Sequence, residues 1–182
     1  YLEAEDITIT GILLLYNNML QSLFDSQIKS LGFVMLIIAL MFLVLFRSLK
    51  LMIIGIVPNL LSALLVLGIM GIINLPLDMM TITIAAITVG IAVDNSIHYI
   101  YRFKEEFTTY RNYEETIIAC HSSIGRAIFF TGITVIFGFS ILVLSNFIPT
   151  IIFGTLTGFA MLVALVLVLT LLPRLLISMK PL

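Results

Sequence analysis

Five long apolar runs divide this chain and restrict it to one class of fold. They cover about residues 31–46, 51–73, 79–101, 127–144 and 151–177. A helix needs roughly 20 apolar residues to cross the hydrocarbon core of a bilayer. Because 61% of the 182 residues are hydrophobic and only 10% are charged, the chain holds more apolar residues than one soluble core can bury. The sequence therefore predicts an all-α membrane protein with five transmembrane helices.

The charge and cysteine content excludes several classes of function. The formal net charge of −1 leaves no basic surplus for binding nucleic-acid phosphates. The single cysteine, Cys120, cannot form a disulfide within the chain or a cysteine cluster for a metal. No set of nucleophile, base and orienting group is visible, and Asp94 with His98 would give a metal only two ligands. We expect no enzyme activity, no metal and no cofactor other than a coupling ion.

The segment before the first run has a different pattern. Residues 12–29 show apolar side chains at helical spacing among polar ones, which predicts an amphipathic helix at the membrane interface. The chain opens with Tyr1 and acidic residues and lacks the basic start of a secretory signal. We therefore expect this chain to be part of a longer protein. Residues 30–182 are expected to form the transmembrane bundle.

The basic residues predict the topology. Eight of the nine Lys and Arg residues fall between the first and second runs, between the third and fourth, and at or after the end of the fifth. The other two connections contain none. Positively charged loops remain on the cytoplasmic side of the membrane, so the C-terminus is expected on that side. The protein is expected in the inner membrane.

Three local signals refine the helices. Pro58 lies inside the second run and should bend or locally open that helix. Asn112 and Glu115 resemble a capping box that starts a cytoplasmic helix leading into the fourth run. Gly154 and Gly158 form a GxxxG pattern, which is typical of contact between helices.

Asp94 is the residue that most strongly suggests chemistry. It lies about four residues, or roughly 6 Å, from the centre of the third run. A carboxylate at this depth costs several kcal/mol, about 3 or more, unless it is paired, hydrated or protonated. An acid whose charge depends on local water or a cation suits a proton relay. The alternative is a structural aspartic acid that hydrogen-bonds neighbouring helices.

Helical spacing places other polar or small residues beside Asp94. Thr83, Gly90, His98 and Tyr101 fall within about 40° of it on a helical wheel, whereas Asn95 lies to the side. His98 is one turn nearer the cytoplasm, and imidazole passes protons near neutral pH. Alternatively, His98 marks the hydrated end of the helix.

Two further groups could contribute to the same pathway. Thr131 and Thr134 belong to a stripe of small and hydroxylated residues in the fourth run, which could line a file of water or simply allow close packing. Asn59, next to Pro58, is a polar group that needs a partner and could face Asp94.

The stretch from Gly90 to Glu106, GIAVDNSIHYIYRFKEE, resembles the fourth-helix signature of the resistance-nodulation-division (RND) transporters. It is most similar to their predicted-exporter and mycobacterial-membrane-protein-large-like branch. The order of Phe46-Arg-Ser48, Pro58, Leu75 to Asp78 and Phe147 to Pro149 resembles the same family, over about residues 10–177.

The resemblance implies the second to sixth helices of a six-helix repeat, in one half, the C-terminal one, of a twelve-helix transporter. It also implies that residues 1–29 are the end of an extracytoplasmic domain plus the amphipathic interfacial helix. Asp94 matches the family's relay aspartate, while Asn95 departs from the tyrosine frequent in the mycobacterial branch. The family implies partners: the bilayer, a hydrophobic or amphiphilic substrate, the other half with its porter domain, and further copies or accessory subunits.

Two functions remain open from the sequence. The first is the membrane module of a proton-driven exporter, in which sodium could replace the proton. The second is a non-transporting membrane module that resembles the related sterol-sensing domains and binds a lipid or a partner protein. In that case Asp94 would be structural.

Overall fold

The computed structural model describes residues 12–73 and 79–182 of the chain. Every regular element in these ranges is helical, which confirms the predicted all-α membrane fold. The elements are α1 (Ile12–Phe46), α2 (Leu49–Ile72), α3 (Met79–Tyr110), α4 (Tyr113–Cys120), the π-helical η1 (His121–Gly125), α5 (Arg126–Ser140), the 3-10 turn η2 (Ile141–Leu144) and α6 (Ile148–Met179).

Four helical stretches in the described ranges are long and apolar enough to cross a membrane. They are Lys29–Phe46, Leu49–Ile72, Tyr113–Leu144 and Ile148–Met179. The predicted crossing at 79–101 lies within α3, which is not among these four. The predicted total of five crossings is therefore not established by length and composition.

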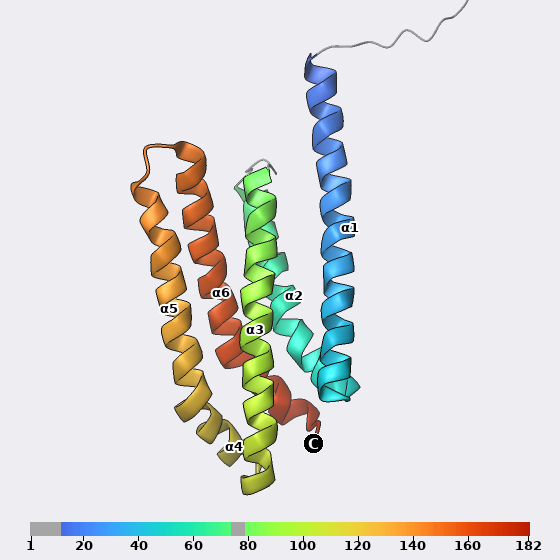
Figure 1. Cartoon of the computed structure of the whole chain (residues 1–182), viewed down its shortest axis with the longest axis vertical. Coiled ribbons are helices and arrows are strands. Elements are labelled where there is room, and N and C mark those ends of the chain that lie inside the picture. Colours follow the sequence, from blue (N-terminus) through green and yellow to red (C-terminus); the bar gives the residue numbers. More distant parts are fainter. Residues whose placement is uncertain (1–11, 74–78) are drawn as a thin grey trace, which may run out of the picture.

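Helix α6 is the centre of the bundle. It packs against α2, α3 and α5, while α1 packs mainly against α2 at the side of the bundle (Figure 1). The turn from α3 to α4, the α1–α2 connection and the C-terminus all lie at the lower end in this view. This arrangement agrees with the predicted placement of the basic loops at one end.

The outer surface of the bundle is apolar. Side chains such as Phe33, Val44, Leu64, Phe137 and Val166 are between 49% and 76% exposed. Soluble monomers rarely expose apolar patches larger than a few hundred Å². These side chains are therefore placed to contact lipid.

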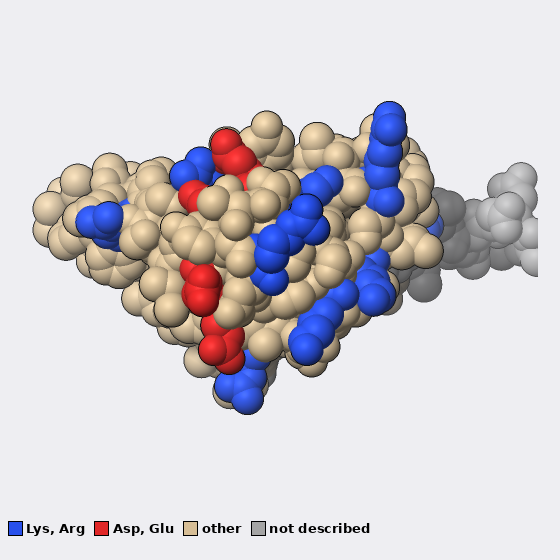
Figure 2. All heavy atoms as spheres, turned by 90° about the horizontal axis from the view of Figure 1, so that it is seen from below, with Lys and Arg blue, Asp and Glu red and all other residues tan. Residues whose placement is uncertain are grey.

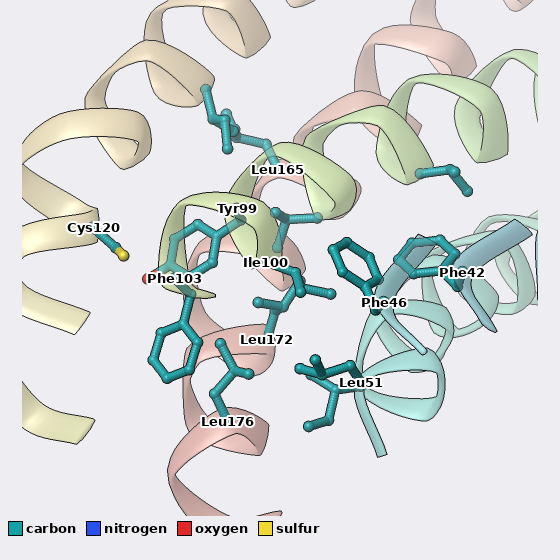
Figure 3. Close-up of a cluster of buried hydrophobic side chains, with 14 of the residues drawn as sticks. Phe42, Phe46, Leu51, Tyr99, Ile100, Phe103, Cys120, Leu165, Leu172 and Leu176 are labelled. Carbon is teal, nitrogen blue, oxygen red and sulfur yellow. The ribbon is translucent and has the colours of Figure 1, made fainter. Parts of the chain in front are cut away.

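The inner faces of four helices meet in one hydrophobic cluster. Phe42 and Phe46 of α1 and Leu51 of α2 lie on one side, and Ile100 of α3 and Leu172 of α6 lie opposite them (Figure 3). All but Phe46 are fully buried, and Phe46 is 4% exposed. The cluster fixes which face of α3 points into the bundle and therefore which face points out.

Helix α1 is one continuous helix of 35 residues. At 1.5 Å per residue it is about 50 Å long, which exceeds the roughly 30 Å of a hydrocarbon core. Its N-terminal part extends beyond the upper ends of the other helices (Figure 1). The predicted extension at 12–29 is thus helical, and its interfacial position stays a prediction. The domain end predicted before residue 12 lies outside the described residues.

The predicted helix start at residue 112 is confirmed. The Asn112 side chain accepts a hydrogen bond from the backbone N–H of Glu114 at 3.1 Å and donates one to the Glu115 carboxylate at 3.3 Å. The first contact satisfies one orphan backbone N–H of the first turn. The second joins two side chains and differs from a capping box, in which the carboxylate accepts from the backbone N–H of the cap residue. From there the chain stays helical through α4, η1 and α5.

Three helices end at the lower side with a basic residue in the left-handed conformation. Arg47, Arg111 and Lys180 have φ values of 50°, 52° and 40°, and each backbone N–H bonds the carbonyl four residues before it. A positive charge at this position also complements the partial negative charge of a helix C-terminus. The basic residues therefore stabilise this end of the bundle locally.

Candidate functional site

Asp94 and His98 lie together on α3. The His98 Nε2 atom is 3.5 Å from the Asp94 Oδ1 atom, a contact that becomes an ion pair when the imidazole is protonated. The two residues are four apart, so α-helical geometry alone places them one above the other. The side chains are 69% exposed for Asp94 and 61% exposed for His98. The pair therefore faces away from α2 and α6.

The residues predicted to lie beside Asp94 on α3 share this outer face, and together with Asp94 they form a stripe along the helix. Thr83, Gly90, Asp94, His98 and Tyr101 are all exposed, whereas Asn95 is partly buried. The opposite face of α3 carries the buried residues Val89, Ala92, Ser96, Tyr99 and Phe103. Polar and small residues thus recur along one exterior side of α3, on an otherwise apolar bundle.

Asn59 is fully buried and contacts α3 at Ser96. Its Nδ2 donates to the Gly55 carbonyl at 2.6 Å and to the Ser96 hydroxyl at 3.2 Å. The Ser96 hydroxyl bonds the Ala92 carbonyl at 3.0 Å. Ser96 is two residues from Asp94 but on the inner face. Asn59 therefore joins α2 to the helix that carries Asp94, through a serine that the sequence analysis did not single out.

We expect Asn59→Ala to weaken the α2–α3 contact. Interhelical hydrogen bonds in membrane proteins contribute about 1 kcal/mol, and the substitution also leaves the buried Ser96 without its interhelical partner. Thermal unfolding of the purified full-length protein measures the loss. Thr155→Ala is the matched control, because the exposed Thr155 hydroxyl bonds the Ile151 carbonyl of its own helix. Equal melting temperatures for the two variants would contradict a stabilising role for Asn59.

Thr131 and Thr134 lie apart from Asp94 within this bundle. Both are exposed on α5, and their hydroxyls donate to the carbonyls of Ala127 and Phe130 in the same helix, each at 2.9 Å. Helix α5 packs mainly against α6 (Figure 1). In residues 12–73 and 79–182 no hydrogen bond joins these hydroxyls to Asp94. Their predicted part in the relay stays a prediction.

Charged residues gather at the lower end of the bundle (Figure 2). Below His98, Arg102 forms ion pairs with Glu105, at 2.7 Å, and with Glu106. The hydrogen bond to Glu105 raises the pKa of the Arg102 guanidinium above its ordinary value. The stripe that begins among apolar side chains therefore ends at a charged, hydrated surface.

Two cavities border the stripe, one of about 370 Å³ beside Tyr101 and Lys104 at the charged end and a smaller one beside Gly90. A cavity of about 130 Å³ lies between α1 and α3, lined by Leu31, Val34 and Gly90 among other residues. Ligand pockets usually enclose about 300 Å³ or more, so this cavity is too small for a lipid-like molecule. Across the two described ranges, no three His, Cys, Asp or Glu side chains form a metal-ligand set. At Asp94 itself the geometry offers the pair with His98.

Comparison with known proteins identifies the family. The profile of the MMPL family matches residues 2–179, nearly the whole chain. The chain belongs to the MMPL family. It is also 29% identical over 140 residues to a membrane protein of Methanocaldococcus jannaschii. That match covers 77% of this chain but 36% of the relative, so it spans about a third of the relative's length. No solved structure matches the chain.

Membership of the MMPL family confirms the resemblance drawn from Gly90 to Glu106. The family connects the bundle to the membrane part of RND-type transporters. Together with the long apolar helices, it shows a multi-pass membrane protein.

Proposed function

We propose that this chain is the membrane module of a proton-driven secondary transporter that exports hydrophobic or amphiphilic, lipid-like molecules. The observation that carries the proposal is the Asp94–His98 pair on the outer face of α3, 3.5 Å apart. MMPL family membership supports a transporter part. The proton is the coupling ion, and the module needs neither an enzyme reaction nor a bound cofactor.

Because Asp94 is exposed in this bundle, another part of the protein must shield it from lipid in the membrane. A carboxylate that faced lipid at this depth would cost about 3 kcal/mol or more. The neighbouring Gly90 borders open space, because a Cβ atom added there would meet nothing within 4 Å. We propose that the other half of the transporter packs on this face and encloses the pair. The same half, with its porter domain, completes the substrate path.

In this arrangement Asp94 binds and releases the proton, and His98 connects it to the cytoplasmic surface. A proton shifts the balance between two conformations only if it binds them with different affinity. An interface between two halves provides this difference, because hydration and contacts at Asp94 change when the halves move. Thr131 and Thr134 are proposed to act in the relay through water when the halves are assembled.

The proposed orientation places the lower end in the cytoplasm. Arg47, Arg111 and Lys180 end three helices there, and Lys and Arg side chains spread across this end (Figure 2). Cytoplasmic loops carry such an excess of basic residues. We therefore propose an inner-membrane protein with a cytoplasmic C-terminus.

The proposal is tested by export from cells that make the full-length protein. The probe is a fluorescent phosphatidylethanolamine, and its release to an external acceptor is followed with and without a protonophore. We expect release above that of control cells, and we expect the protonophore to remove the excess. Release that persists after the proton gradient collapses, while a sodium gradient remains, would contradict proton coupling.

A lipid-sensing module is the second candidate. It is favoured by the α5 hydroxyls, which bond their own helix and do not reach Asp94. In that case cells with and without the protein would release the probe at equal rates. The same lipid would instead raise the melting temperature of the purified protein.

A further inference from the structure

His121 connects three helical segments near the lower end of the bundle. It begins η1, the π-helical segment between α4 and α5. Its Nδ1 atom lies 2.9 Å from the Tyr99 hydroxyl on α3, and its Nε2 atom lies 3.1 Å from the Leu169 carbonyl on α6. The rings of Tyr99 and His121 meet edge to face, with centroids 5.7 Å apart.

The Leu169 carbonyl needs a donor because of Pro173. In an α-helix this carbonyl would accept from the N–H four residues later, but proline has none. Pro173 is buried inside α6. Leu169 is partly buried and the His121 ring beside it is exposed. Proline in membrane helices is tolerated where neighbouring groups supply the missing bond. The imidazole of His121 supplies it here.

For the neutral ring, only one tautomer fits both contacts. A carbonyl only accepts, so the hydrogen must be on Nε2, and Nδ1 of the neutral ring then accepts from the Tyr99 hydroxyl. Tyr99 is fully buried, so its hydroxyl depends on this partner. The Ile117 carbonyl, 3.2 Å from Nδ1, accepts a hydrogen bond from the backbone N–H of His121. One neutral ring thus satisfies both helices.

We propose that His121 is a positioning residue that ties α3 to the proline hinge of α6. Tyr99 is five residues after Asp94, and its side chain lies on the buried face of the helix whose exposed face carries Asp94. A displacement of α3 when Asp94 changes its proton therefore moves His121, and His121 moves the segment of α6 after Leu169. π-Helical segments such as η1 often occur at functional sites. This inference rests on the proposed function.

A double-mutant cycle on the purified full-length protein tests the contact with α6. Pro173→Ala restores the backbone donor, so the Leu169 carbonyl no longer needs His121. We expect His121→Ala to lower the melting temperature by several degrees in the native background and clearly less in the Pro173→Ala background. Ser122→Ala is the matched control, because its exposed hydroxyl bonds the Ala119 carbonyl of the same segment. Equal losses in both backgrounds would overturn the assignment of the bond.

The coupling is tested by the labelling rate of a cysteine at the end of α6. Ser178→Cys, exposed at this end, is labelled with a maleimide in membranes containing the full-length protein. We expect Asp94→Asn to change the rate at least severalfold, and His121→Ala to abolish this difference while Ser122→Ala keeps it. A difference that survives His121→Ala overturns the positioning role alone. No effect of Asp94→Asn with His121 intact overturns the proposed function and this inference together.

Discussion

Asp94→Asn should reduce export by the full-length protein to the level of cells that lack it. Asparagine keeps the size and hydrogen bonding of the side chain but cannot bind or release a proton. With no proton to favour one conformation over the other, the gradient cannot drive the cycle, whatever the affinity for substrate. The loss should be complete, because the other acids of α3, Glu105 and Glu106, lie about three turns further on and pair with Arg102.

The fold should tolerate this change. Asp94 is 69% exposed, and its described contact is with His98 on the same helix. Asparagine has nearly the same size and still forms hydrogen bonds, so it leaves neither a cavity nor a clash on the face that the other half is proposed to cover. The melting temperature and the amount in the membrane should therefore match the native protein. Asp94→Glu, which still titrates, should keep measurable export. Full export by Asp94→Asn at normal expression would make Asp94 structural and favour the lipid-sensing module.

The helices of this chain could be predicted because their signals are local. Apolar runs identify membrane helices directly, and the cap at Asn112 depends on residues within three positions of it. The π-helical segment at His121–Gly125 gave no such signal. An extra residue in a helical turn forms only where tertiary contacts stabilise it. Here these contacts are made with Tyr99 and Leu169, which are distant in sequence.

The site was predictable in its residues but not in its surroundings. Spacing alone places Asp94, Gly90 and His98 on one face of a helix. Spacing does not show which face points into the bundle, because in lipid both the exterior and the interior are apolar. Here the interior face carries the small polar residue Ser96, which pairs with Asn59, and the acidic face points outward. Only contacts between helices decide how α3 is rotated about its own axis.

Glycines on the α5–α6 contact provide the second large expected effect, this time on stability. A Cβ atom built on Gly154 would lie 2.7 Å from the backbone carbonyl oxygen of Phe139 and 2.6 Å from the Leu142 Cβ. Neither atom belongs to the flexible end of a side chain, so the helices must separate. Overpacking of this kind costs about 1–3 kcal/mol, occasionally more. Gly154→Ala should therefore strongly lower the melting temperature and the yield of folded protein.

Gly158, one turn further along α6, is the matched control for Gly154. Its added Cβ would meet Ser140 Oγ at 3.5 Å and the Ile136 carbonyl oxygen at 3.8 Å, which are ordinary contacts. Alanine costs less backbone entropy than glycine in a helix, by about 0.5–1 kcal/mol, so Gly158→Ala should be neutral or stabilising. Gly132→Ala should fall between the two, because its Cβ would press on the movable methyl groups of Leu165. Thermal unfolding of the three variants gives the order directly. A Gly158→Ala loss as large as that of Gly154→Ala would mean that the GxxxG pattern packs as a whole, with no single close approach at Gly154.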